Sequence, residues 1–334
     1  MKNHLNLFRI TVLGLVFLFL TGCSSDEGTI AAPPSATIIG IATTNQPNLT
    51  TLATALNRFP DLVTTLNSTG NFTVFAPTNA AFTKFLASTT FATVNDVPLP
   101  ILREIVLNHV LNGSYTTIAT AGATTFSSGY LKTLAKGSAS STNTLSMYVN
   151  ASAGSVLLNG ISFITTANIF GTNGVVHIVD DVISLPSIAT HAVANPSFST
   201  LAAVVSSTGG VFGDQSAVAS VFASYTAPLT VFAPTNDAFA AAVATGAWAN
   251  NITPAQITKV LQYHVTGAGN ILATSLTQGR VISMITSPVL TTTIDLVGGA
   301  KIKDTQNIAA NISITDVQCT NGVLHAVDKV LRPF

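Results

Sequence analysis

The stretch Thr73-Val-Phe-Ala-Pro-Thr-Asn-Ala-Ala-Phe82 occurs a second time, as Thr230-Val-Phe-Ala-Pro-Thr-Asn-Asp-Ala-Phe239. A later stretch, Asn173-Gly-Val-Val-His-Ile-Val-Asp-Asp-Val-Ile183, also returns, as Asn321-Gly-Val-Leu-His-Ala-Val-Asp-Lys-Val-Leu331. We call the first stretch block one and the second block two. Two blocks that repeat once, in the same order, indicate a duplicated domain rather than a short solenoid unit. The chain has 334 residues, so each copy is long enough to bury its own core.

The repeat also predicts how the chain is divided. Positions 73 and 230 lie 157 apart, whereas positions 173 and 321 lie 148 apart, so the second copy carries a net deletion. We expect five segments: a signal peptide over 1–22, a flexible tether over 23–45, domain 1 over 46–185, a linker over 186–195 and domain 2 over 196–334. The tether is predicted from its Pro, Ala, Thr and Ser content.

Each domain shows helical periodicity first and strand patterns afterwards. Apolar residues at i, i+3 and i+7, such as Leu49, Leu52 and Leu56, predict an amphipathic first helix. Thr253 followed by Pro254 predicts a capped helix start, and Asn159-Gly160 predicts a hairpin turn between two strands. Helices followed by strands favour an α+β fold with an antiparallel sheet.

The N-terminus is typical of an export signal. Lys2 and Arg9 precede a short apolar stretch over 10–20, which is too short to span a membrane. It ends in Leu20-Thr21-Gly22-Cys23, which resembles the bacterial lipobox. The resemblance implies cleavage before Cys23 and attachment of two or three acyl chains such as palmitate, enough for stable membrane anchoring.

The residues after Cys23 bear on where the protein resides. No Asp follows Cys23 directly, which is consistent with an outer-membrane lipoprotein. The pair Asp26-Glu27 resembles a short export signal of surface lipoproteins, but it is equally consistent with the solvated start of a tether. Both a surface-exposed and a periplasm-facing protein therefore stay open, with the surface slightly favoured.

Composition and motifs argue against several classes of function. The net charge is zero and only 8% of residues are charged, so nothing favours nucleic-acid binding. No catalytic or phosphate-binding motif occurs, and we expect no enzyme and no cofactor. We also expect no metal site, because Cys319 is the single thiol besides Cys23 and the carboxylates Asp180 and Asp181 lack a ligand loop. Cys319 is predicted to be a buried small hydrophobe.

The two blocks resemble the signatures of the fasciclin-like domain. A Tyr-His pair lies between them in that family; it is present here as Tyr263-His264, whereas domain 1 has Asn108-His109. The resemblance covers nearly all of 46–334. It implies a β-sandwich or wedge with helices packed around it in each domain. It also implies a role in adhesion to cells or matrix, in which the Tyr-His region has been implicated.

Tyr263, His264, Asn108 and His109 are therefore the candidate partner-binding residues. The alternative is structural: both histidines lie on the apolar stripe of a predicted helix, where a ring bonded to nearby backbone is the simplest reading. We prefer that alternative for them.

Our leading hypothesis is a lipid-anchored envelope protein that mediates adhesion or matrix (biofilm) interaction with an extracellular protein or polysaccharide. The alternative is a binding module for a small ligand or polysaccharide. Because the shared blocks record what each domain needs to fold, the informative positions are those where the copies differ: Asn108 against Tyr263, Ala80 against Asp237, and Asp181 against Lys329.

Overall fold

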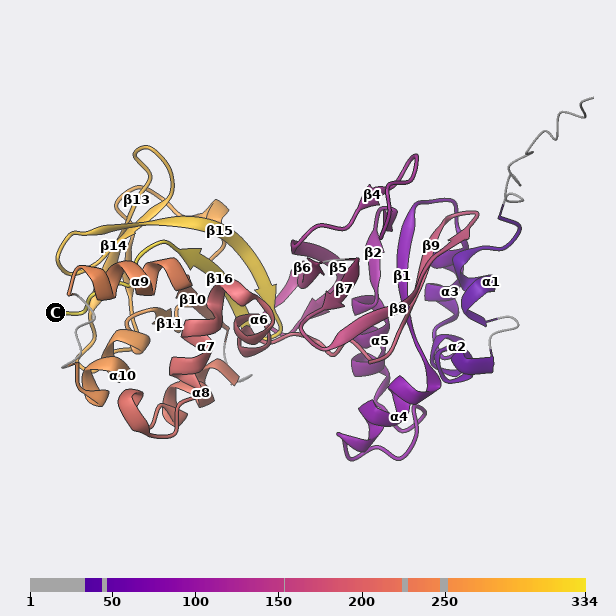
Figure 1. Ribbon diagram of the computed structural model, residues 1–334, viewed down its shortest axis with the longest axis horizontal. Helices are drawn as coiled ribbons and strands as arrows, with labels where there is room; N and C mark the ends of the chain where they lie inside the picture. The colour runs from indigo at the N-terminus through magenta and orange to yellow at the C-terminus, as the bar shows by residue number, and fades with distance from the viewer. Residues whose placement is uncertain (1–33, 44–46, 153, 224–227, 247–251) are drawn as a thin grey trace, which may run out of the picture. The chain divides into compact units, whose positions relative to one another are not determined.

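The computed structural model describes residues 34–43, 47–152, 154–223, 228–246 and 252–334 (Figure 1). Residues 34–334 belong to one compact unit, which contains two domains of similar construction. The predicted signal peptide, the lipid-attachment residue Cys23 and the first part of the tether lie outside the described residues.

Domain 1 places short helices before and after its first strand and then forms a barrel. Its helices are α1 (Ile38–Thr43), η1 (Pro47–Leu49), α2 (Thr50–Asn57), α3 (Pro60–Asn67), α4 (Asn79–Ala87) and α5 (Leu99–Asn108). Its strands are β1 (Phe72–Pro77), β2 (Val110–Asn112), β3 (Tyr115–Thr116), β4 (Thr124–Thr125), β5 (Gly129–Gly137), β6 (Ser140–Ser152), β7 (Ser155–Leu158), β8 (Ser162–Gly171) and β9 (Gly174–Val179). The barrel runs β1-β2-β5-β6-β7-β8-β9 and closes by pairing β9 with β1, while β3 and β4 form a separate pair.

Domain 2 repeats this order. Its helices are α6 (Ile188–Ala194), η2 (Pro196–Phe198), α7 (Ser199–Val205), η3 (Gly210–Phe212), α8 (Ser216–Ala223), α9 (Asn236–Ala244), α10 (Pro254–Gln262) and η4 (Ala273–Ser275). Its strands are β10 (Leu229–Pro234), β11 (Val265–Thr266), β12 (Val281–Ser283), β13 (Thr291–Asp295), β14 (Lys301–Lys303), β15 (Ala309–Cys319) and β16 (Gly322–Val327). They form one sheet in the order β11-β10-β16-β15-β14-β13-β12, with α7, α8, α9 and α10 gathered on one side of it (Figure 1).

The two sequence blocks are neighbouring strands of the same sheet. Block one contains all of β1 except Phe72 and continues into α4, and block two contains β9. These strands pair in parallel from Phe72 opposite Gly174 to Pro77 opposite Val179. β10 and β16 pair in the same way in domain 2. The expectation of an antiparallel sheet is therefore corrected: the main sheet of each domain is mostly antiparallel with one parallel pair, and the small β3–β4 sheet is parallel. The reason is that helices and a long meander separate the two blocks, and such a path can bring the chain back in the same direction.

Both faces of this central strand pair are buried. Val74 and Ala76 point into a core formed with the helices, which we call the helix-side core. Phe75 points into a second core formed by the strands, which we call the strand-side core. In domain 2, Val231 points into the core formed with the helices and Phe232 into the core formed by the strands. Alternation along a strand sends successive side chains to opposite faces. The apolar run of block one thus joins two cores in each domain, which confirms the α+β class with helices packed on the strands.

The structure differs from the expected tether and linker at two short helices. Helix α1 lies within the expected tether, yet Ile38, Ile39 and Ala42 are buried in domain 1. Helix α6 forms most of the expected linker and packs Ile188 into domain 2. Each helix is tied to block two, because the backbone N–H of its first residue donates to an Asn side chain of that block at 3.0 Å. Helices of six or seven residues are too short to show a clear period in sequence.

Local signals predicted from sequence are confirmed. The Thr253 side chain accepts a hydrogen bond from Gln256 N at 3.3 Å, and the Gln256 side chain completes the capping box. Asn159 and Gly160 have φ angles of 48° and 73° and connect β7 to β8. Positive φ at both central residues is the requirement of a type I′ hairpin turn.

Hydrogen bonds connect the β5–β6 hairpin of domain 1 to the end of β15 in domain 2. Ser146 Oγ accepts from Gln318 N at 3.0 Å, and Ala139 N donates to Thr320 O at 2.9 Å. Lys132 Nζ donates to Asp316 O at 2.7 Å. The two domains therefore share backbone contacts in addition to the covalent connection.

Candidate functional site

His109 and His264 occupy equivalent positions at the ends of α5 and α10. The Nδ1–H group of His264 donates to Val260 O at 2.7 Å, and its Nε2 accepts from Leu331 N at 2.9 Å. His109 makes the same two bonds, to Ile105 O at 2.7 Å and from Ile183 N at 2.9 Å. Each ring is therefore a neutral imidazole whose tautomer is set by two backbone groups. It fastens the end of the helix to the last residue of block two.

Asn108 and Tyr263 precede these histidines, and their side chains donate hydrogen bonds to different parts of the domain. The Asn108 amide donates to Ile183 O at 3.0 Å and to Ser184 O at 3.1 Å. The Tyr263 ring lies in the strand-side core of domain 2, and its hydroxyl donates to Thr291 O at 2.7 Å. An amide and a phenol thus serve the same purpose, because each donates to backbone carbonyl groups of a neighbouring segment.

All four candidate partner-binding side chains are buried. The exposed fractions are 0% for Asn108, 4% for His109, 0% for Tyr263 and 2% for His264. Side chains as buried as these offer a partner no surface in the folded domain. Partner contact through these residues stays a prediction, and their hydrogen bonds support the structural alternative.

The histidines of block two support an irregular part of the neighbouring strand. His177 Nδ1 accepts from Asn168 N at 3.3 Å, and its Nε2–H donates to Tyr115 O at 2.9 Å. His325 does the same with Asp316 N at 3.3 Å and Ile271 O at 2.8 Å. Asn168 and Asp316 both have positive φ, at 60° and 59°, where β8 and β15 shift register. The rings thus satisfy backbone N–H groups that a bulge removes from the ladder.

Burial shifts the titration of these groups away from neutral pH. Loss of hydration lowers the pKa of His109, His177 and His264 from 6.5 to about 4. Burial also raises the pKa of Cys319, which lies in the helix-side core of domain 2. Cys319 is therefore a protonated thiol within an apolar cluster, as predicted.

The acidic residues of block two hold strands together. Asp180 Oδ1 accepts from Phe163 N at 2.7 Å, and Asp328 Oδ1 accepts from Asn311 N at 2.7 Å. Asp181 pairs with Lys84 at 3.1 Å. Over the part of the chain that the structure describes, no group of three or more His, Cys, Asp or Glu side chains could hold a metal ion.

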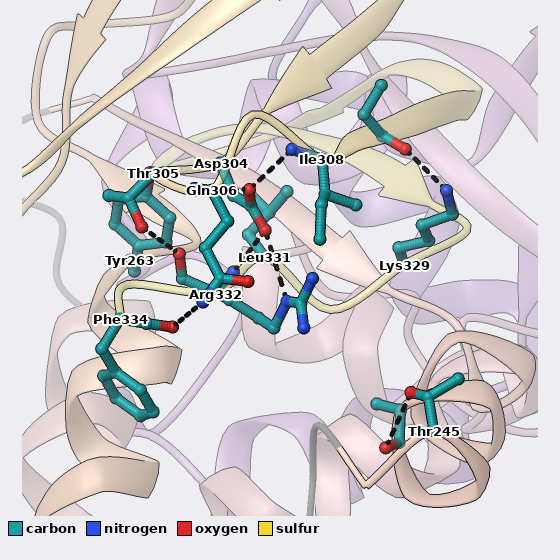
Figure 2. Close-up of polar contacts among 12 residues, drawn as sticks. Thr245, Tyr263, Asp304, Thr305, Gln306, Ile308, Lys329, Leu331, Arg332 and Phe334 are labelled. Atoms are coloured by element: carbon teal, nitrogen blue, oxygen red, sulfur yellow. Dashed lines mark hydrogen bonds and ion pairs between the residues drawn. The ribbon is translucent and has the colours of Figure 1, made fainter.

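A groove with mostly apolar walls lies on domain 2. It has a volume of about 280 Å³ and lies between helix α9, Ile308 and the segment after β16. We call it the α9 groove; its lining residues are Ala238, Ala241, Ala242, Thr245, Ile308, Lys329, Val330 and Arg332. Figure 2 shows Lys329 and Arg332 on the C-terminal segment, with Thr245 at the end of α9 on the opposite side.

Two of the residues that line the α9 groove, Lys329 and Arg332, carry positive charges. Lys329 Nζ donates to Ala309 O at 2.9 Å, and among the described residues it has no carboxylate partner. Arg332 Nε lies 3.6 Å from the Asp304 carboxylate. That carboxylate also accepts backbone N–H groups from Gln306 and Ile308 at 2.9 Å and from Arg332 at 3.2 Å (Figure 2). The Asp304 charge therefore offsets that of Arg332, whereas no carboxylate of the described residues pairs with the Lys329 ammonium group.

Sequence reasoning did not predict this groove. Its walls come from helix α9, the loop between β14 and β15, and the end of the chain after β16, and no periodic pattern indicates such a surface. One signal was present, namely the difference between Asp181 and Lys329 at equivalent positions.

Comparison with known proteins identifies the fold. The sequence pattern of the Fasciclin domain matches residues 47–186 and again residues 196–333. The chain belongs to the Fasciclin domain family. Fasciclin domains are adhesion-type modules, and this chain carries two in tandem.

Relatives occur in mycobacteria and cyanobacteria. The chain is 43% identical over 97 residues to the immunogenic protein MPB70 of Mycobacterium bovis, covering 28% of this chain and 46% of that protein. It is 44% identical over 97 residues to the cell surface glycolipoprotein MPB83 of the same species, covering 28% and 40%. It is 35% identical over 157 residues to protein sll1483 of Synechocystis, covering 47% and 78%. The chain thus spans less than half the length of the two mycobacterial Fasciclin proteins.

A solved FAS1 domain pair from the insect cell adhesion molecule fasciclin I aligns with 83% of this chain and 94% of that chain, at 17% identity and a TM-score of 0.49. In the described part of this chain, no helix combines the length and the apolar character needed to cross a membrane.

Proposed function

We propose that this chain is a lipid-anchored outer-membrane protein that mediates adhesion or matrix interaction through its two Fasciclin domains. The observation that carries the proposal is the order of parts: a lipobox Cys23 precedes two adhesion-type domains. Acyl chains on Cys23 would hold the protein in the membrane. A relative named as a cell surface glycolipoprotein supports the same placement.

Two domains on one anchored chain favour weak but multivalent attachment. A second binding event on the same chain is intramolecular, so its effective concentration is high even when each contact is weak. With 8% charged residues and no net charge, recognition would depend on polar and apolar surface contacts more than on long-range steering. An extracellular protein or polysaccharide is the partner class that fits this surface.

Deletion of the gene is expected to reduce attachment and biofilm formation, and the wild-type gene is expected to restore both. Complementation with Cys23→Ala should restore neither, because the unlipidated protein would leave the membrane. Incorporation of labelled palmitate into the wild-type protein and not into C23A tests the anchor separately. Attachment that is unchanged in the deletion strain would contradict the adhesion role, and equal labelling of C23A would contradict the anchor.

A further inference from the structure

The α9 groove has a counterpart at the equivalent place in domain 1. That second groove, of about 380 Å³, is lined by Lys84, Phe85, Ser88, Ile161, Asp181, Val182 and Ser184. Copies of block one lie 157 positions apart, so its residues 84, 85 and 88 correspond to 241, 242 and 245. Copies of block two lie 148 apart, so its residues 181, 182 and 184 correspond to 329, 330 and 332. The same surface is therefore hollowed in both domains.

The two grooves differ in charge. In domain 1, Lys84 on α4 and Asp181 face each other across the groove and form an ion pair of 3.1 Å. In domain 2 the helix position holds Ala241, and the acidic position holds Lys329. Ser184 is likewise replaced by Arg332. The changes remove the ion pair of the first groove. Lys329 has no carboxylate partner among the described residues, and Arg332 lies beside Asp304.

The walls of the two grooves differ as well. Phe85 and Lys84 line the domain 1 groove, whereas two alanines take their places in domain 2. Small side chains on α9 leave open an apolar surface formed by Ala238, Ala242, Ile308 and Val330. Val330 is 9% exposed and Ala242 8%, so the apolar surface is concave rather than a protruding patch.

We infer that the α9 groove of domain 2 binds a small carboxylate that carries an apolar chain. The apolar walls accept the chain, and Lys329 and Arg332 receive the carboxylate at the mouth. The Arg332 Nη groups make no hydrogen bond to any described residue, so they can donate to such a ligand. The volume is close to the lower limit of about 300 Å³ for ligand pockets, which restricts the ligand to a small molecule. This site is independent of the proposed adhesion role and goes beyond it.

Octanoate is the probe that tests this inference. It is titrated at pH 7 into the chain from residue 24 onward, and binding is measured by calorimetry and by NMR. Octanoate is expected to shift signals of α9 and of residues 329–332. 1-Octanol has the same chain without the charge and should bind about tenfold more weakly, because one charge-assisted hydrogen bond contributes about 1.5 kcal/mol.

Two variants separate the contribution of the site from that of the fold. Lys329→Gln should weaken octanoate binding about tenfold and leave octanol unchanged. The double variant A241K/K329D rebuilds the ion pair of domain 1 and should abolish binding. Lys84→Gln in the domain 1 groove is the matched control and should have no effect. Circular dichroism verifies that each variant is folded.

Several results would overturn the inference. These are the absence of octanoate binding, equal affinity for octanoate and octanol, full affinity in K329Q, or loss of binding in K84Q.

Discussion

The Gly322→Ala protein is expected to lose its folded second domain. Gly322 begins β16 and pairs with Leu229 in the parallel ladder, with φ at 153°. A Cβ atom built there would lie well inside van der Waals contact of the Leu229 carbonyl oxygen. That oxygen belongs to the central strand, whose faces are both buried, so it cannot move aside. The substitution should therefore lower the free energy of unfolding by more than about 4 kcal/mol, which is comparable with the whole stability of a domain.

Circular dichroism and NMR test this expectation, because the dispersed methyl resonances of domain 2 should disappear. Gly174→Ala makes the same clash with Phe72 in domain 1 and should unfold that domain instead. Gly298→Ala is the matched control: its φ is 71°, and the nearest atom is the flexible Lys301 Nζ at 3.7 Å. It should cost only about 1 to 2 kcal/mol. A Gly322→Ala protein as stable as wild type would contradict the parallel pairing.

Acid is expected to destabilise both domains well before their carboxylates titrate. The unfolded chain binds protons on its imidazoles near pH 6.5, whereas the folded chain binds them on His109, His177 and His264 only near pH 4. Between these values the unfolded state holds more protons, so the free energy of unfolding falls as the pH falls. Each such histidine can remove about 3 kcal/mol over that range.

Urea denaturation at pH 8.5, 7.5, 6.5, 5.5, 5 and 4.5 measures this loss. The unfolding free energy should change little between pH 8.5 and 7.5, where the imidazoles are neutral in both states, and should decline steeply below pH 6.5. The pKa of His325 is also lowered by burial, so the free energy of unfolding of domain 2 should decline with pH as that of domain 1 does. Equal stability at pH 7.5 and pH 5 would show that the rings are hydrated in the folded state.

Sequence predicted the parts of the fold that depend on local pattern. The Thr253 cap, the Asn159-Gly160 turn and the buried Cys319 follow from residue type and spacing, and the structure confirms all three. The direction of strand pairing did not follow, because alternation along a strand records burial but not which strand lies beside it. Helices α1 and α6 were missed because six or seven residues contain too few turns to show a period.

The candidate site was predicted less well than the fold. Positions on the apolar stripe indicated that His109 and His264 are core residues, and their hydrogen bonds agree with this. The α9 groove could not be predicted, because a surface formed by distant segments has no signature in any one of them. The difference between Asp181 and Lys329 gained its meaning only when both residues were found at equivalent grooves.

The central claim is that the shared motifs build each domain and that binding depends on surfaces where the domains differ. Substitution of His264 by alanine tests it most directly, with unfolding and cell attachment measured on the same protein. The variant is expected to lose about 3 kcal/mol of stability, because the buried Leu331 N–H and Val260 carbonyl lose their partner and a cavity remains. Attachment per folded molecule should be unchanged. A His264→Ala protein that keeps its stability but loses attachment would contradict the claim.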